Sequence, residues 1–113
     1  MIPNVKDCQE PLLHFLSDGK THSWQECSDA IANHFHLTQE ERNTLQPNGK
    51  DTKIHFNVGW AKHHLRMAGM VETVKRGHYR ITDKGMMHIS KQYKSNESRI
   101  TRFVNKIKQY NLP

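Results

Sequence analysis

Basic side chains gather in the middle and C-terminal parts of the chain. Residues 1–49 carry three basic and seven acidic side chains, a balance of −4, whereas residues 50–80 and residues 81–113 each carry seven basic and two acidic side chains, a balance of +5. Lysine and arginine bind phosphate oxygens, so a chain that separates its charges in this way can present a basic face to a polyanion. The alternative is that the surplus of basic side chains serves solubility.

The side chains suited to contact DNA come from one expected helix, the loop before it and the hairpin after it. Arginine and lysine donate to phosphates and guanine, and asparagine pairs with adenine. Each basic residue alone is explained as well by a solvated surface, but a basic helix next to a basic hairpin favours nucleic acid. The candidates are Lys50 and Lys53 in the loop, Asn57, Gly59, Lys62, His63 and Arg66 on the helix, and Lys75, Arg76, His78 and Arg80 on the hairpin.

Other reactive side chains give weaker patterns. The nine histidines include the pairs His34-x-His36 and His63-His64, but zinc sites use two pairs of Cys or His at recurring spacings. We therefore expect no metal site and no cofactor. Histidines close to phosphates would instead make DNA binding depend on pH. Ser23 and Ser28 lie near an expected helix start, which explains them without a nucleophilic role.

The two cysteines and the apolar pattern indicate the compartment. Cys8 and Cys27 have no partner at metal-binding spacing, so a reducing cytosol is expected, with both thiols in or near the core. No stretch approaches the roughly 18 apolar residues of a membrane span. Residues 1–7 lack the apolar run of a secretory signal. We expect a cytoplasmic protein without a membrane partner.

Three helices are expected before the basic helix. The apolar run Pro11–Leu16 is helical in type and stops at Ser17-Asp18-Gly19. Ser23 and Glu26 form a capping-box pattern that opens a helix to about His34, and Thr38-Gln39-Glu40-Glu41 repeats the pattern and opens a short helix from Gln39 to Leu45. A polar loop follows from Gln46 to about Lys53.

The basic helix is expected over residues 55–68, with Gly69 as its C-cap. At 100° per residue its inward arc holds Phe56, Trp60, Ala61, Leu65, Met67 and Ala68, with Val58 at the edge, and its outward arc holds Gly59, Lys62, His63 and Arg66. Trp24 and Trp60 are both expected in the core. Glycine inside a helix costs roughly 1 kcal/mol against alanine, so we expect either another backbone or a neighbour in the domain to lie close to Gly59.

Two short strands are expected next, Met70–Lys75 and His78–Thr82, joined by a turn at Arg76-Gly77. A further helix is expected from Asp83 to Tyr93, and after a polar linker an amphipathic helix from Arg99 to Tyr110. This order predicts a mostly α, α+β fold: a winged helix-turn-helix with a helical bundle, a two-stranded hairpin wing and a C-terminal helix. Residues 1–94 would form the winged-helix domain, and residues 95–113 the linker and C-terminal helix.

Four motifs occur in a distinctive order over about residues 8–90. They are Pro11-Leu12-Leu13 with Asp18-Gly19 and His22-Ser23; Leu37-Thr38-x-Glu40-Glu41-Arg42; Asn57-Val58-Gly59-Trp60-Ala61; and Arg76-Gly77-x-Tyr79-Arg80-Ile81-Thr82-Asp83-Lys84-Gly85. Together they resemble the N-terminal domain of Mrr-type, modification-dependent (type IV) restriction endonucleases. The resemblance implies a winged-helix domain that binds double-stranded DNA ahead of a nuclease domain. That nuclease cuts DNA with modified, typically methylated, bases in defence against foreign DNA.

The chain departs from such proteins in lacking a nuclease motif. That nuclease type holds Mg²⁺ with acidic residues beside a lysine, but residues 81–113 contain only Asp83 and Glu97 as acids, and neither has a lysine two positions later. We therefore expect no catalytic residues here. Either a nuclease domain lies downstream in the full-length protein, or this is a stand-alone relative.

Three functions follow from these expectations. The first is the target-recognition domain of an Mrr-like restriction endonuclease. The alternative is a stand-alone winged-helix transcription regulator that forms a homodimer through the helix Arg99–Tyr110. The third is a protein-interaction winged helix that does not bind DNA.

Overall fold

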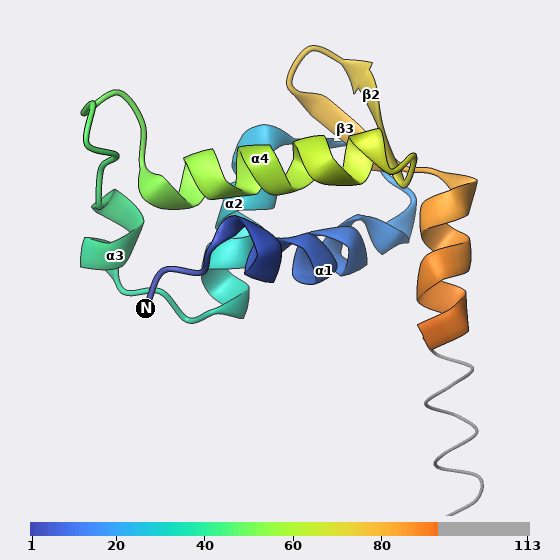
Figure 1. Ribbon diagram of the computed structural model, residues 1–113, viewed down its shortest axis with the longest axis horizontal. Helices are drawn as coiled ribbons and strands as arrows, with labels where there is room; N and C mark the ends of the chain where they lie inside the picture. Colours follow the sequence, from blue (N-terminus) through green and yellow to red (C-terminus); the bar gives the residue numbers. More distant parts are fainter. Residues whose placement is uncertain (93–113) are drawn as a thin grey trace, which may run out of the picture.

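A computed structural model describes residues 1–92 of the chain (Figure 1). The fold is mostly helical α+β with a small antiparallel sheet, as predicted. The expected boundary after residue 94 and the expected helix Arg99–Tyr110 lie outside the described residues. The elements are α1 (Val5–Phe15), the 3-10 turn η1 (Leu16–Asp18), β1 (His22–Ser23), α2 (Trp24–His34), α3 (Gln39–Asn43), α4 (Lys53–Met67), β2 (Val71–Lys75), β3 (His78–Ile81) and a last helix over residues 83–92.

Side-chain caps fix where the helices begin. The two predicted capping boxes are confirmed: Ser23 caps α2 together with Glu26, and Thr38 caps α3 together with Glu41. The helix α4 begins at Lys53, two residues earlier than expected, because the Thr52 hydroxyl accepts a hydrogen bond from the His55 amide at 3.3 Å. The helix α3 ends at Asn43 rather than Leu45.

The core lies between α1, α2 and α4. Leu12, Leu13 and Leu16 from the first helix and its 3-10 extension are fully buried against Ile31 and Val58. No helix within the described part of the chain is both long enough and apolar enough to cross a membrane.

The two cysteines belong to this core, as predicted. Cys8 and Cys27 are buried free thiols. Burial raises the pKa of Cys8 to about 11 and that of Cys27 to about 12. The thiolate is the reactive form of cysteine, so both side chains act as small apolar packing groups.

The sheet has three antiparallel strands in the order β1-β3-β2, one strand more than the predicted two-stranded hairpin. The hairpin itself, with its turn at Arg76-Gly77, is confirmed. The added strand β1 has only two residues, His22 and Ser23, which pair with Tyr79 and His78. Neither residue type favours strands. The strand β1 therefore forms because β3 offers a pairing edge, and not because of the preferences of its own residues.

The burial of α4 differs from the predicted inward arc. Ile54, Val58, Ala61 and Leu65 are buried, whereas Phe56 is 40% exposed, Trp60 46% and Met67 72%. The helix carries two apolar rows of the same spacing, offset by two residues and therefore by about 200°. Only the row that begins at Ile54 faces the core. The other row, with Trp60 at its centre, faces solvent, so the placement of Trp60 in the core is wrong.

The last helix is held against α1 and against the turn between α4 and β2. Its residues His88 and Gln92 each bind the Glu10 carboxylate of α1 at 3.1 Å. At its start, the Thr82 amide donates to the Met70 carbonyl at 2.9 Å. Gly85 packs directly on that carbonyl, because a Cβ atom at this position would lie 2.4 Å from the Met70 oxygen.

We expect Gly85→Ala to destabilise the protein by about 1–3 kcal/mol, the usual cost of overpacking a tight contact. Helix propensity alone predicts the opposite sign, a gain of about 1 kcal/mol. The measurement is the free energy of unfolding from chemical denaturation. The matched control is Ser90→Ala on the exposed side of the same helix, for which a change within about 0.5 kcal/mol is expected. A stabilised Gly85→Ala variant would contradict the close approach.

Candidate nucleic-acid interface

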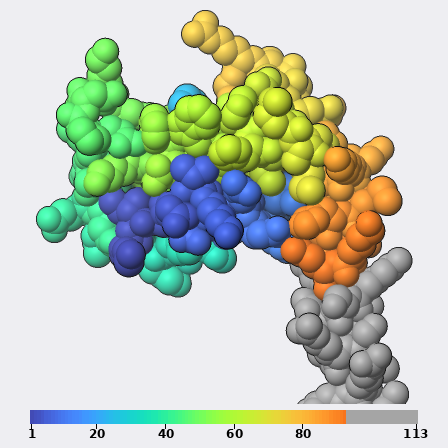
Figure 2. Space-filling view, viewed as in Figure 1, coloured from blue at the N-terminus to red at the C-terminus, as the bar shows by residue number. Residues whose placement is uncertain are grey.

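The helix α4 forms an exposed ridge beside α1, and the β2–β3 hairpin rises from its C-terminal end (Figures 1 and 2). Its inner side packs on α1 and α2. Its outer side carries Phe56, Trp60, His63 and Met67 in one row. Helix and hairpin therefore form one continuous surface.

Lys62 joins the helix to the hairpin. Its ammonium nitrogen lies 4.5 Å from the centre of the Tyr79 ring on β3 and 5.9 Å from the Trp24 ring on α2. A cation over an aromatic face is attracted by the ring's electrons. Because Tyr79 is buried, this contact holds a positive charge at the junction of α4 and the hairpin.

Trp24 fixes α2 against α4. Its indole nitrogen donates to the His55 carbonyl at 3.1 Å, and its ring stacks on the His55 imidazole with centroids 3.9 Å apart and an interplanar angle of 17°. The same imidazole lies 2.6 Å from the Ser28 hydroxyl through Nδ1. A Cβ atom at Gly59 would lie only 2.7 Å from Trp24 Cζ2. The neighbour expected close to Gly59 is thus the Trp24 ring, within the domain.

Beside Gly59 the surface of α4 is hollowed. The hollow has a volume of about 300 Å³ and is open to solvent. The Trp60 ring meets the Phe56 ring at 61° and the His63 ring at 86°, both edge to face. The lining residues are Trp24, Phe56, Gly59, Trp60, Lys62 and His63.

The predicted DNA-contacting residues occupy different environments. Gly59, Lys62 and His63 are brought together in the hollow. Arg80 forms a salt bridge with Glu72 across the hairpin, through Nε at 2.9 Å and Nη2 at 2.6 Å. Asn57 donates to the Pro3 carbonyl at 2.9 Å and so fixes the N-terminal segment. His78 is half-buried, and Lys50, Lys53, Arg66, Lys75 and Arg76 are exposed.

Sequence reasoning missed the aromatic part of this surface. Phe56 and Trp60 were expected in the core and instead line the hollow, together with the half-buried Trp24. The sequence did contain a signal. One apolar row of α4 is complete without Phe56 and Trp60, so the second row was not needed for the core; the complete row is Ile54, Val58, Ala61 and Leu65. Recognising it requires the true start of α4 at Lys53.

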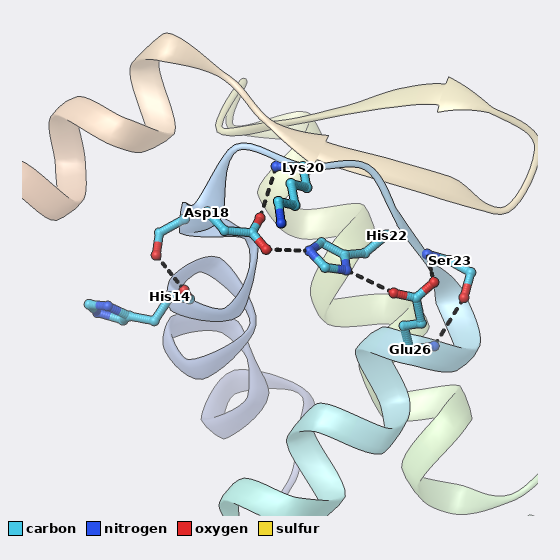
Figure 3. A network of polar contacts seen from close by, with 7 residues as sticks. His14, Asp18, Lys20, His22, Ser23 and Glu26 are labelled. Carbon is cyan, nitrogen blue, oxygen red and sulfur yellow. Dashed lines mark hydrogen bonds and ion pairs between the residues drawn. The ribbon is translucent and has the colours of Figure 1, made fainter.

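A network around His22 braces the base of the hairpin (Figure 3). Its Nε2 lies 2.8 Å from Asp18 and its Nδ1 2.9 Å from Glu26. Burial lowers the pKa of His22, but the hydrogen bonds and charges of Glu26 and Asp18 outweigh it, so the pKa of His22 is raised. The hydrogen bond from His22 lowers the pKa of Glu26. Because His22 pairs with Tyr79 in the sheet, this network connects η1, α2 and β3.

No cluster of three or more His, Cys, Asp or Glu side chains suited to a metal ion occurs within residues 1–92.

A family model described as the Mrr N-terminal domain matches residues 6–91, which confirms the resemblance noted from the motifs. No curated protein and no solved structure matches the chain. The matched range contains all of α4 and the hairpin.

We expect His22 to make stability depend on pH. Because its pKa is raised on folding, its contribution is complete below the ordinary value of 6.5 and is lost as pH rises through the raised value. The pKa of Glu26 is lowered, so its contribution is complete above 4.5 and is lost at lower pH. The difference in unfolding free energy between the wild type and His22→Gln should therefore be largest at about pH 4.5–6.5.

The measurement is chemical denaturation of both proteins at intervals from pH 4 to pH 9. The exposed His34 at the end of α2 provides the control His34→Gln, which should not reproduce the pH dependence. A wild-type advantage that grows from pH 6 to pH 9 would contradict the raised pKa of His22.

Proposed function

The chain belongs to the Mrr N-terminal domain family, and we propose that it binds double-stranded DNA as a winged helix in an Mrr-type restriction system. In this role it recognises the target and does not cut it. Cleavage would be supplied by a Mg²⁺-dependent nuclease domain of the same system. DNA with modified bases is the proposed target.

The observation that carries this proposal is the surface shared by α4 and the hairpin. The major groove of B-DNA admits an α-helix, and a neighbouring hairpin can follow the sugar-phosphate backbone. Here α4 is exposed along one side and is joined to the hairpin by the contact of Lys62 with Tyr79. A rigid helix and hairpin can contact one duplex together without an ordering step at the interface.

The charges on this surface support DNA over other partners. Arg66 is exposed on α4, and Lys75 and Arg76 are exposed where the hairpin turns. Lys53 lies in the first turn of α4, where the free amide groups of a helix favour phosphate. We assign phosphate contacts to these four residues. Arg80 has a smaller role because Glu72 already binds its guanidinium group.

We expect Arg66→Ala and Arg76→Ala each to weaken binding to a DNA duplex and to lower the slope of log K against log salt by about one. Removing one phosphate contact releases about one counterion fewer on binding, which produces this change. The measurement is fluorescence anisotropy with a labelled duplex at a series of salt concentrations between about 50 and 200 mM.

The control is Lys6→Ala, which removes an exposed positive charge from α1 and should leave the slope unchanged. An effect of Lys6→Ala equal to that of Arg66→Ala would place the interface on another face. A wild-type protein that binds no duplex at low salt would refute DNA binding and leave a protein-interaction domain.

A further inference from the structure

We propose that the hollow on α4 holds the 5-methyl group of a pyrimidine in the major groove of duplex DNA. This assigns a specificity role to Phe56 and Trp60, alongside the basic residues that contact phosphate. The inference rests on the proposed function, since it requires α4 to lie in the major groove.

Large aromatic side chains are exposed where a solvated helix face would be polar. Phe56 is 40% exposed and Trp60 is 46% exposed. Their rings contact each other rather than the core. Clustered apolar side chains on the surface of a soluble domain mark interaction sites. Gly59 also lines the hollow, and because it has no side chain the Trp24 ring lies directly against the helix and forms part of the lining.

The surroundings of the hollow favour a polyanion. Lys62 lines it, Lys53 lies one turn before Phe56, and Arg66 lies one turn after Lys62. The centres of protein-protein interfaces are depleted in lysine. Small-molecule sites bury most of their ligand, whereas a hollow of about 300 Å³ that opens to solvent leaves much of a ligand exposed.

Among the groups in the major groove, the methyl group suits this lining best. The base edges present hydrogen-bond donors and acceptors, and the one apolar group there is the 5-methyl of a pyrimidine. Aromatic side chains make up half of the lining residues, and Lys62 and His63 contribute its charged and polar side chains. A methyl group can be buried against such rings without leaving a polar atom unpaired.

The ring geometry disfavours a base rotated out of the duplex. An extruded base is held by stacking between flat side chains. Here Trp60 meets its neighbours Phe56 and His63 edge to face, and Trp24 already stacks on His55. These rings are therefore not arranged as a parallel pair that could stack on both faces of a base, but their faces and edges can contact a small group.

Thymine and 5-methylcytosine carry the same methyl group at the same place in the groove. The experiment therefore compares duplexes of one sequence by anisotropy: one with thymine, one with uracil in its place, and one with uracil together with 5-methylcytosine. Uracil removes the methyl groups and keeps the base pairing. We expect the uracil duplex to bind about fourfold more weakly for each methyl group that the hollow buries. If 5-methylcytosine restores the affinity lost with uracil, the hollow accepts the methyl group of modified cytosine. If it does not, the hollow takes the methyl group of thymine.

Variants connect this preference to the hollow. Phe56→Ala and Trp60→Ala should bring the ratio of thymine to uracil affinities close to one, while the salt slope, which reports the phosphate contacts, stays near the wild-type value. Met86→Ala, which removes an apolar side chain of similar exposure, 43%, from the last helix, should keep the wild-type ratio. Circular dichroism checks that each variant is folded, and Phe56→Leu, which removes only the ring, provides a milder change.

Three results would overturn the inference. Equal binding of all three duplexes by the wild type would remove the methyl preference and leave DNA binding intact. A preference retained in both Trp60→Ala and Phe56→Leu would place methyl recognition elsewhere. Binding to none of the duplexes would refute the proposed function itself, and a partner protein would then be the occupant of the hollow.

Discussion

The position of Trp24, fixed by hydrogen bonds from both its backbone and its ring, is the constraint on which the rest of the structure depends. The backbone amide of Trp24 donates to the Gly77 carbonyl in the hairpin turn at 2.9 Å, and its side chain donates to the His55 carbonyl on α4. One residue thus fixes α2, the hairpin and α4 relative to one another. Lys62 then lies over Tyr79 because both sides of that contact are already in place.

This arrangement leaves α4 with one buried side and one exposed side. One row of side chains, from Ile54 to Leu65, is buried against α1 and α2, and the opposite row is left exposed. Apolar surface on both sides of one helix is expensive in water unless one side meets a partner. In the proposed complex with DNA, the basic residues around the exposed row would attract the phosphates over long range, whereas the aromatic rings would act only on contact. The proposal thus assigns attraction of DNA and discrimination between bases to different side chains of the same helix.

The parts of the fold that depend on neighbouring residues could be predicted from the sequence. The capping boxes at Ser23 and Thr38 and the turn at Gly77 are local, and all three are confirmed. The strand β1 and the hydrogen bond from Asn57 to Pro3 could not be predicted, because each depends on a partner more than 50 residues away. Trp60 shows a further limit: a tryptophan at an apolar helical position is ordinarily core, and only the packing of α4 reveals which of its two rows is buried.

The contact between Trp24 and Gly59 also couples two distant positions of the sequence. The ring occupies the space that any side chain at position 59 would need, so the two residues behave as one unit under substitution. Effects of changes at contacting sites do not add: a smaller ring at position 24 is what would make room for alanine at position 59. In related chains a side chain at position 59 is therefore expected only together with a smaller side chain at position 24.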